Sequence, residues 1–372
     1  MAKIGVYTFS NTKDNYGQVL QYLATQEYLN SRGHNTCLII PLDEKISLHK
    51  RILYKLTSVV NRIYSLVIKH KSKQIKQQTI YQYWSEVTDR LEKQYPRYFD
   101  KFRNDNFHVM HIRLSELSNG CLDAVAVGSD QTWSWSSKYG FCAFPKKNIK
   151  KFALAPSLGQ HVFSDEAKKW LSHWIHDFDF ITCREQSGID LCTSLGKESV
   201  LLLDPTFLLT KEDYSKYAES FSLPSRNFIL LYLLGAEVNV AIDEVYKLAR
   251  MHDLDIIYIA SQGRDDDFSK LYATVPQWLY AVEKSSYVVT NSFHGMAFSI
   301  IYQKLFLTLP LSGETKNMNE RMESLASQLN LEDRIYQGSL EKLFDPIDYT
   351  KSTDRIFSNR DMLSRLLNQI NL

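Results

Sequence analysis

The amino-acid sequence predicts an α/β fold in which helices cover both faces of a parallel sheet. The chain opens with a short apolar run, KIGVYTF, followed by a polar turn, a helical pattern and a second apolar run, TCLIIPL. Both apolar runs are almost continuous, which is typical of strands buried on both faces of a parallel sheet. The same order of apolar run, polar turn and helical pattern recurs along the chain, and this repetition defines the α/β class.

The first strand-helix-strand unit occupies the opening of the chain. A helix is predicted between the polar turn SNTKDN and Gly33, because apolar residues recur there at helical spacing. Those residues are Val19, Leu20, Leu23, Tyr28 and Leu29. With the two flanking apolar runs, this helix predicts a β-α-β start.

The remaining predicted strands fall into two groups, which predict two domains. The first group contains DAVAVGSD, KFALAPS, DFITCRE and VLLLDPTF, and the second contains NFILLYLLG, DIIYIAS, SYVVTNS and LFLTLP. The polar segment KEDYSKYAESFSLPSRN separates the groups, and 372 residues exceed the usual size of one core. We expect an N-terminal domain over 1–210 and a C-terminal domain over 225–345. A closing helix over 350–372 could pack back on the N-terminal domain.

One stretch of the predicted N-terminal domain departs from the pattern. Residues 49–76 contain eight Lys or Arg and no acidic residue, and their apolar positions have helical spacing. We therefore expect a basic helical insertion near 48–95, with its apolar stripe covering the core. The same helix could instead rest on an anionic membrane surface or recruit a partner protein.

Composition excludes several classes of protein. Forty-four Lys and Arg against forty-two Asp and Glu give a formal net charge of +2, too little to predict a nucleic-acid partner. The N-terminus has no secretory apolar region, and no run of about 18 apolar residues occurs. Five cysteines without a C-x-x-C pair are typical of reduced core thiols. We expect a cytoplasmic protein without a cofactor or obligatory metal, since no His, Asp and Glu cluster has ligand spacing.

The turns that follow the strands are the places to search for chemistry, because ligands of doubly wound sheets bind at the carboxyl ends of strands. The first such turn, KDNYGQVLQ, places Gly17 at the opening of a helix, where backbone N–H groups and the helix dipole favour an anion. Asp14 or Asn15 could equally be the N-cap of that helix.

The next turns carry polar and charged residues at strand ends. AVAVGSDQTW places Ser129, Asp130 and Gln131 where the chain leaves a strand, which suits hydroxyl or anion recognition or a capped turn. Arg184 ends the apolar run DFITC, and a guanidinium can bind a carboxylate or phosphate through two parallel hydrogen bonds. Glu185 could instead neutralise it. Asp204 precedes a proline, and such a residue is more often structural than catalytic.

The stretch TNSFHG places a histidine at a strand-to-helix junction. His294 follows the strand SYVVT, and Gly295 begins the next helix. A histidine there can transfer a proton near neutral pH or bind a phosphate, whereas most single histidines pack and form hydrogen bonds in a core. If the strands are parallel, His294, Arg184 and Gly17 face the same edges of the two sheets.

Six segments in order resemble the polysaccharide pyruvyl transferase family: DNYGQVLQYLATQEYLNSRGH, AVAVGSDQTW, CREQSGIDL, LLLDPTFLL, TNSFHGMAFSIIYQKLF and NERMESLASQLNLEDR. They run from residue 14 to residue 334. The resemblance implies two Rossmann-like domains similar to GT-B glycosyltransferases, with the active site in the inter-domain cleft. It also implies transfer of the carboxyethylidene group of phosphoenolpyruvate to a sugar as a pyruvate ketal, with release of phosphate.

The resemblance also implies roles for particular residues. His294 corresponds to the family's histidine and Arg184 to its strand-end arginine, as general acid and as clamp of the anionic donor. In some members an arginine stands two places before the histidine, where this chain has Ser292, and Arg321 or Lys13 could supply the missing charge. Asp130 or Asp14 could accept the hydroxyl proton. The donor set is Arg184, Ser292, His294, Gly295, Arg321 and Lys13. The acceptor set is Asp14, Asn15, Tyr16, Gly17, Gln18, Ser129 and Gln131.

The expected partners are phosphoenolpyruvate and a sugar acceptor, which we expect to be an oligosaccharide on a polyprenyl diphosphate. Such an acceptor would give the basic residues 49–76 a role at the inner face of the cytoplasmic membrane. Two other functions stay open: a GT-B glycosyltransferase that uses a nucleotide sugar, and a non-catalytic protein that binds glycan or scaffolds polysaccharide assembly.

Overall fold

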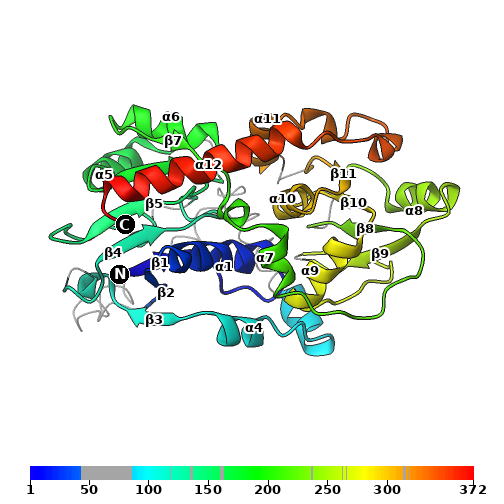
Figure 1. Ribbon diagram of the computed structural model, residues 1–372, viewed down its shortest axis with the longest axis horizontal. Helices are drawn as coiled ribbons and strands as arrows, with labels where there is room; N and C mark the ends of the chain where they lie inside the picture. Colours follow the sequence, from blue (N-terminus) through cyan, green and yellow to red (C-terminus); the bar gives the residue numbers. More distant parts are fainter. Residues whose placement is uncertain are drawn as a thin grey trace, which may run out of the picture.

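Two parallel sheets form the framework of the computed structural model (Figure 1). The structure describes residues 1–42, 86–117, 119–134, 137–159, 163–235, 238–261, 263–264, 266–312, 316 and 318–372. The predicted basic helix over 49–76 lies outside these residues. The fold class is as the sequence predicts, since every strand pairing within the two sheets is parallel.

The first sheet has the strand order β3-β2-β1-β4-β5-β6-β7. Its strands are β1 (Lys3–Tyr7), β2 (Asn35–Pro41), β3 (Val109–Ile112), β4 (Ala124–Val127), β5 (Lys150–Ala153), β6 (Phe180–Cys183) and β7 (Val200–Leu201). The second sheet has the order β11-β10-β8-β9. Its strands are β8 (Phe228–Tyr232), β9 (Asp255–Ile259), β10 (Tyr287–Thr290) and β11 (Leu305–Thr308). Strand β3 was not predicted, because it alternates exposed and partly buried residues at the sheet edge instead of forming an apolar run.

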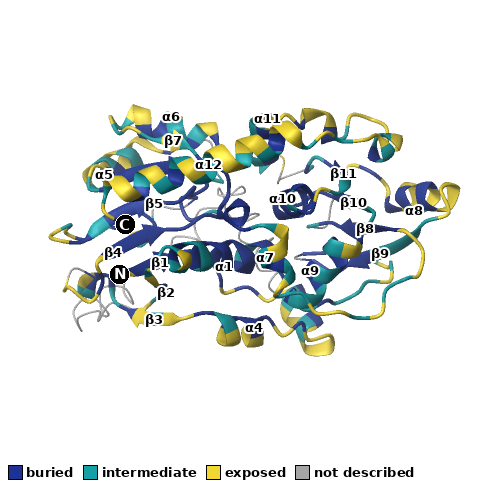
Figure 2. Cartoon of the chain, in the orientation of Figure 1, coloured by how far each residue is buried: buried dark blue, intermediate teal, exposed yellow. Residues whose placement is uncertain are grey.

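Helices pack around both sheets. They are α1 (Tyr16–Ser31), α4 (Phe99–Asn106), α5 (Asp165–Ile175), α6 (Gln186–Ser194), α7 (Lys211–Ser215), α8 (Ile242–Met251), α9 (Val275–Lys284), α10 (Phe293–Ile301), α11 (Glu320–Leu329) and α12 (Thr350–Gln369). Short 3-10 helices are η1 (Leu114–Glu116), η2 (Pro205–Leu208), η4 (Glu332–Arg334) and η5 (Glu341–Phe344). Helices α1 and α10 are buried over most of their length, whereas α5, α8 and α12 each expose one face (Figure 2).

Helix α12 crosses from the second sheet to the first, and both chain termini lie beside the first sheet (Figure 1). Arg32, just after α1, donates to Ser364 Oγ over 2.8 Å and to Asn368 Oδ1 over 2.6 Å. Asn359 accepts a hydrogen bond from the Leu203 backbone over 3.0 Å. The closing helix therefore packs on elements of the first sheet. The domain boundaries at 210 and 225 stay predictions.

Aromatic side chains join the two halves of the molecule. Tyr16, at the start of α1, stacks on Trp278 of α9 with ring centroids 5.2 Å apart and planes 10° apart. The hydroxyl group of Tyr16 donates to the Ala273 carbonyl over 2.7 Å. Since all three residues are buried, this contact holds the N-terminus of α1 against the second sheet.

The prediction that the cysteines are thiols in the core holds for four of the five. Cys37, Cys142, Cys183 and Cys192 are buried and unpaired. Cys121 is exposed, because it lies in the turn that precedes β4.

Candidate active site

The junction between β10 and α10 holds His294 in a fixed position. Ser292 caps the helix by accepting a hydrogen bond from the Gly295 backbone over 3.2 Å. Its own N–H donates to Thr290 Oγ1 over 3.0 Å. A Cβ atom at Gly295 would lie 2.3 Å from Thr290 Oγ1, so only glycine fits there. His294, the second helical residue, is therefore buried with its backbone held on both sides.

The start of α1 lies directly against His294. Asn15 is the N-cap of α1, since its side chain accepts a hydrogen bond from the Gln18 backbone over 3.2 Å. A Cβ atom at Gly17 would lie 1.9 Å from Cγ of His294. The glycine predicted to admit a ligand thus makes room for the imidazole. This close approach brings a residue of the second half onto an element of the first.

Arg184 lies immediately after β6 and is 2% exposed. Its Nη1 donates to Asp204 Oδ2 over 2.9 Å, and its Nε lies 3.5 Å from Glu185 Oε2. The guanidinium carbon lies 4.3 Å from the centre of the Phe293 ring, at cation-π distance. Neither Nε nor Nη2 has a hydrogen-bond partner in the described part of the chain. Arg184 therefore retains donors for an anionic ligand.

Asp204 lies at the centre of the cluster, although sequence reasoning favoured a purely structural role for it. Its Oδ2 atom is 2.8 Å from the Ser129 hydroxyl, in addition to its bond with Arg184. Its Oδ1 atom accepts hydrogen bonds from the N–H and hydroxyl groups of Thr206, over 3.0 and 2.9 Å. The signal that could have identified Asp204 is its place after β7, at the same sheet edge as Arg184.

The imidazole of His294 approaches this carboxylate without bonding to it. Nε2 of His294 lies 3.8 Å from Asp204 Oδ2, too far for a hydrogen bond, and has no other partner among the described residues. Burial lowers the pKa of His294, and the guanidinium groups of Arg184 and Arg321 act in the same direction, while Asp204 and Asp130 oppose it. The imidazole is therefore neutral at neutral pH in the unliganded protein.

Asp204 itself is ionised. Burial alone would raise the pKa of this carboxyl group, but the positive charges of His294, when protonated, and of Arg184 outweigh it. Hydrogen bonds from Thr206 and Ser129 add to the effect, so the pKa lies below its usual range. The site therefore contains a permanent buried negative charge.

Arg321 brings a second guanidinium group towards the same cluster. It is the second residue of α11 and is partly buried. Burial lowers its pKa to about 10, and the positive charge of Arg184 acts in the same direction, while Glu185, Asp130 and Asp204 raise it. Its Nε donates to the Met318 carbonyl over a long 3.4 Å. Two cations thus lie within electrostatic reach of His294.

Asp130 faces the cluster from the end of β4. Its backbone is in the left-handed region, with φ of 65°, a conformation that Asp tolerates better than most residues. Its Oδ2 accepts a hydrogen bond from Gln18 Nε2 over 2.9 Å, and its charge acts on Arg184 and His294. The structure therefore brings together Asp130, Arg184 and His294, the three residues predicted to be catalytic.

Other predicted site residues have partners away from this cluster. Lys13 lies 3.3 Å from Asp89 at the surface. Asp14 accepts hydrogen bonds from the hydroxyl groups of Thr12, over 3.0 Å, and Thr88. Their roles in ligand binding stay predictions. Tyr16 is part of the aromatic contact between the halves, and the carbonyl of Gln131 accepts a hydrogen bond from Ser134 over 2.6 Å.

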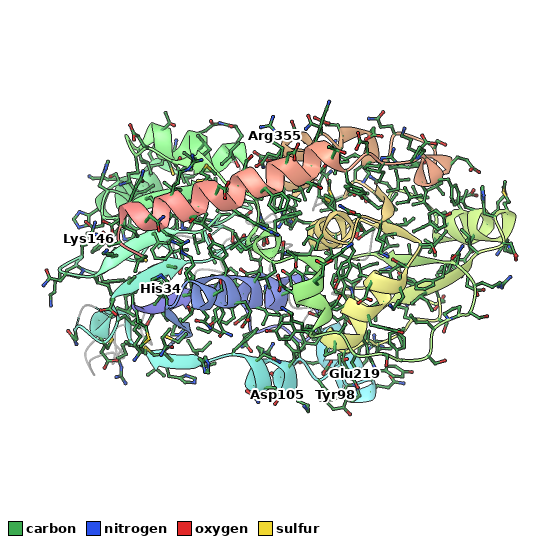
Figure 3. All side chains as sticks on the ribbon, viewed as in Figure 1. His34, Tyr98, Asp105, Lys146, Glu219 and Arg355 are labelled. Atoms are coloured by element: carbon green, nitrogen blue, oxygen red, sulfur yellow. The ribbon has the colours of Figure 1, made fainter. Side chains whose placement is uncertain are left out.

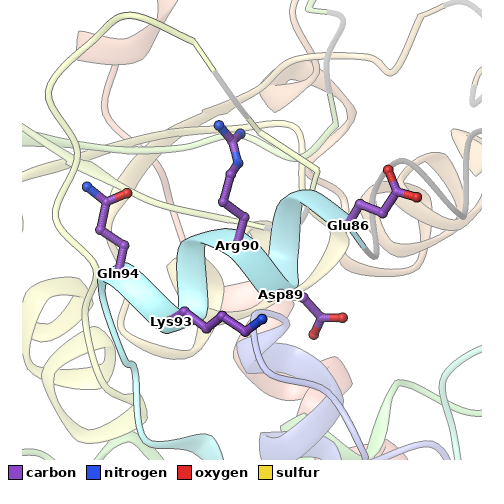
Figure 4. A pocket seen from close by; sticks show the side chains of 5 residues that line it. All are labelled: Glu86, Asp89, Arg90, Lys93 and Gln94. Carbon is purple, nitrogen blue, oxygen red and sulfur yellow. The ribbon is translucent and has the colours of Figure 1, made fainter.

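Charged side chains are also common at the surface, but there they are solvated. Asp105 and Arg355 are exposed at the periphery of the molecule (Figure 3). A hollow along the helical residues 86–94 has charged residues on its wall (Figure 4). Its lining residues are Glu86, Asp89, Arg90, Lys93 and Gln94. None of them belongs to the cluster around Asp204, so this hollow is separate from the candidate active site.

Neither a metal cluster nor a membrane-crossing helix is found in the residues that the structure describes. No group of three or more His, Cys, Asp or Glu side chains there is arranged to hold a metal ion. None of the described helices combines the length and the apolar character that crossing a membrane requires.

The fold and the site define a class: two Rossmann-like halves in a GT-B-like arrangement, with a buried charged cluster where they meet. UDP-N-acetylglucosamine 2-epimerase from Rickettsia bellii has a similar fold, with a TM-score of 0.50, 11% identity and coverage of 99% of this chain and 96% of that one. UDP-GlcNAc 2-epimerase from Neisseria meningitidis matches with a TM-score of 0.47, 12% identity and coverage of 99% and 100%. At 11% identity, the likeness to the Rickettsia bellii enzyme shows the fold alone.

The family follows from the sequence. A family model described as polysaccharide pyruvyl transferase matches residues 15–312. No curated protein gives a significant match. The chain belongs to the polysaccharide pyruvyl transferase family, which confirms the resemblance and makes the protein a transferase of polysaccharide biosynthesis.

The helix cap at Ser292 predicts a modest loss of stability on substitution. Replacing Ser292 with alanine removes the acceptor for the Gly295 N–H, which should lower the free energy of unfolding by about 1 kcal/mol. Urea denaturation measures this change. Threonine at the same position keeps the hydroxyl group and serves as control. An unchanged free energy in the alanine variant would show that the cap is not needed.

Proposed function

We propose that this protein transfers the carboxyethylidene group of phosphoenolpyruvate to a sugar of a surface-polysaccharide precursor, forming a pyruvate ketal and releasing phosphate. The observation that carries the proposal is the meeting of Arg184, Arg321 and His294 at the junction of the two halves. Phosphoenolpyruvate has a carboxylate and a phosphate, together about three negative charges, which two guanidinium groups can bind. Membership of the family supports the same reaction class.

The donor would be held in part by N–H groups of Arg184 that make no hydrogen bond within the described part of the chain. The Nε and Nη2 atoms of Arg184 suit one anionic group of the donor, because they can donate two parallel hydrogen bonds. Arg321 would meet the other anionic group. The cation-π contact with Phe293 keeps the Arg184 guanidinium in a fixed plane.

His294 would act as general acid in the donor complex. In the free protein its pKa is lowered by burial, which favours the neutral imidazole. A bound donor adds negative charge beside the ring and therefore favours the protonated form. The protonated His294 can then transfer a proton to the methylene carbon of the donor.

Asp130 is the best-placed base for the acceptor. It would take the proton of the first sugar hydroxyl as that oxygen bonds to the central carbon of the donor. Phosphate then leaves, and the second hydroxyl adds to close the ketal. Its proton passes to the imidazole of His294, which became neutral when it protonated the methylene carbon. Asp14 is less suited, because it is engaged by Thr12 and Thr88.

The acceptor proposed is an oligosaccharide linked to a polyprenyl diphosphate. The chain would then act at the inner face of the cytoplasmic membrane, where residues 49–76 could contact anionic lipid. The family itself implies a sugar or polysaccharide acceptor, and the lipid linkage is the finer proposal.

Donor identity can be tested by ligand binding and turnover. Phosphoenolpyruvate should raise the melting temperature in a concentration-dependent way, whereas UDP and other nucleoside diphosphates should not. Incubation with phosphoenolpyruvate and a lipid-linked oligosaccharide should release phosphate and add one carboxyethylidene group to the glycan, as seen by mass spectrometry. Stabilisation by nucleotides alone would favour a glycosyltransferase, and binding of glycan without turnover would favour a non-catalytic role.

A further inference from the structure

We propose that Asp204 is a positioning residue whose fixed negative charge orients Arg184 and promotes protonation of His294. This inference rests on the proposed function for its catalytic meaning, since it assigns a partner to the general acid. The coupling between Asp204 and His294 is nevertheless a property of the protein without substrate, and it can be measured there.

The carboxylate of Asp204 is immobilised from one side. Pro205 begins the 3-10 helix η2, and Asp204 is its N-cap. Both hydrogen bonds to Oδ1 come from Thr206, one from its backbone and one from its hydroxyl group. These bonds leave Oδ2 directed to the groups on the opposite side, which are Ser129, Arg184 and His294.

This arrangement does more than neutralise a buried arginine. Glu185 also lies beside Arg184, so a second carboxylate is available for charge balance. Among the described residues, Asp204 is the carboxylate that lies within 4 Å of the His294 ring nitrogen. A small rotation of the imidazole would shorten the 3.8 Å separation to a hydrogen bond once Nε2 carries a proton. Asp204 is therefore placed to stabilise the imidazolium form.

The charges that face His294 determine the sign of the expected effect. Asp204 and Asp130 favour the protonated ring, while Arg184, Arg321 and burial favour the neutral ring. Removing the charge of Asp204 leaves one anion against two cations. The pKa of His294 should then fall further, so that the ring loses its proton, and with it its role as general acid, at a lower pH.

The test is the variant Asp204→Asn, which keeps the shape and the oxygen acceptor for Thr206 but removes the charge. NMR titration of ¹³C-labelled histidine in the unliganded protein follows His294, whose signal is assigned by its absence in His294→Gln. We expect its midpoint to move to lower pH by about one pH unit. We also expect the alkaline limb of kcat/KM to move in the same direction, with activity lower by about tenfold above pH 7.5, because a shift of one pH unit lowers the protonated fraction of His294 tenfold there.

A second variant gives the opposite sign. Ser129→Ala removes a hydroxyl group 2.8 Å from Oδ2, which leaves the Asp204 charge less screened. The His294 midpoint should then move to higher pH. Because this change is small, it also serves if Asp204→Asn does not fold. The control is Asp266→Asn, which removes another partly buried carboxylate, paired with Arg264 and Lys270 in the second half, and should leave the His294 titration unchanged.

The outcomes separate the inference from the proposed function. If Asp204→Asn and Ser129→Ala leave the titration midpoint of His294 in place, the inference is wrong whatever the substrate. If the midpoint moves as expected but phosphoenolpyruvate is never consumed, the inference stands and the proposed function fails. Equal shifts in Asp204→Asn and Asp266→Asn would also overturn the inference, because they would reflect a general loss of stability.

Discussion

Replacing Arg184 with lysine should weaken binding of phosphoenolpyruvate by on the order of 10²-fold, which corresponds to about 2.7 kcal/mol. Lysine keeps the positive charge but has no planar fork, so it cannot donate two parallel hydrogen bonds or stack on Phe293. The bond to Asp204 would also lose its geometry. Thermal-shift titration and calorimetry with the donor measure the affinity, and urea denaturation measures the free energy of unfolding.

The matched control for this change is Arg334→Lys. Arg334 is as buried as Arg184, at 2% exposure, and donates to the carbonyls of Lys342 and Asp345 in the second half. Both variants should lower stability, because each loses bonds that a guanidinium makes in a buried site. Only Arg184→Lys should lose donor affinity. Equal donor affinity in the two variants would refute the clamp role of Arg184.

The fold could be predicted from the sequence where apolar runs mark buried parallel strands. Residues such as Ile229 and Val289 lie in runs that are almost continuously apolar, because helices cover both faces of their sheet. Strand β3 could not be predicted in this way, because Val109 and His111 are exposed at the edge of the first sheet and the strand has no apolar run. An edge strand needs no apolar run, so local composition does not reveal it.

The candidate site could be predicted only in part. Parallel strands place their carboxyl ends at the same edge of a sheet, so residues that follow such strands can be assigned to that edge. Asp130 follows β4 and Arg184 follows β6 of the first sheet, while His294 follows β10 of the second. The sheet edges at which they lie could therefore be inferred from topology. The contact between Gly17 and His294 could not, because it depends on how closely the two halves approach. Residues paired across two sheets have no fixed spacing in the sequence.

Asp204 shows a second limit of sequence reasoning. An aspartate before proline is explained well by a helix cap, and Asp204 does cap η2 through Oδ1. Its other oxygen has a separate set of partners, of which Arg184 follows β6 and His294 belongs to the second half. Because the helix cap explains the role of Oδ1, there was no reason in the sequence to look for partners of Oδ2.

Replacing His294 with glutamine should lower turnover by about 10³-fold and leave the protein folded, because a general acid contributes on the order of 10²–10⁴ to the rate. Glutamine retains polar atoms of similar reach but does not transfer protons near neutral pH. Phosphate release from phosphoenolpyruvate measures the rate, and circular dichroism monitors the fold. The control is His252→Gln, at a histidine that pairs with Glu341 at the surface, 3.1 Å away, and should keep full activity. Full activity in His294→Gln would exclude this residue as the acid.

The same variant should make the protein less sensitive to acid. The pKa of His294 in the folded state lies below its ordinary value near 6.5, mainly through burial. As the pH falls through that range, the unfolded chain takes up a proton at this position before the folded protein does, so the free energy of unfolding decreases. His294→Gln removes this contribution, whereas the other histidines contribute equally to both proteins. Between pH 7.5 and 5.5 the variant should therefore lose on the order of 1 kcal/mol less stability than the parent protein in urea denaturation. A variant that loses as much stability as the parent would mean that His294 is protonated as readily when folded as when unfolded, and that the buried, neutral ring described here is wrong.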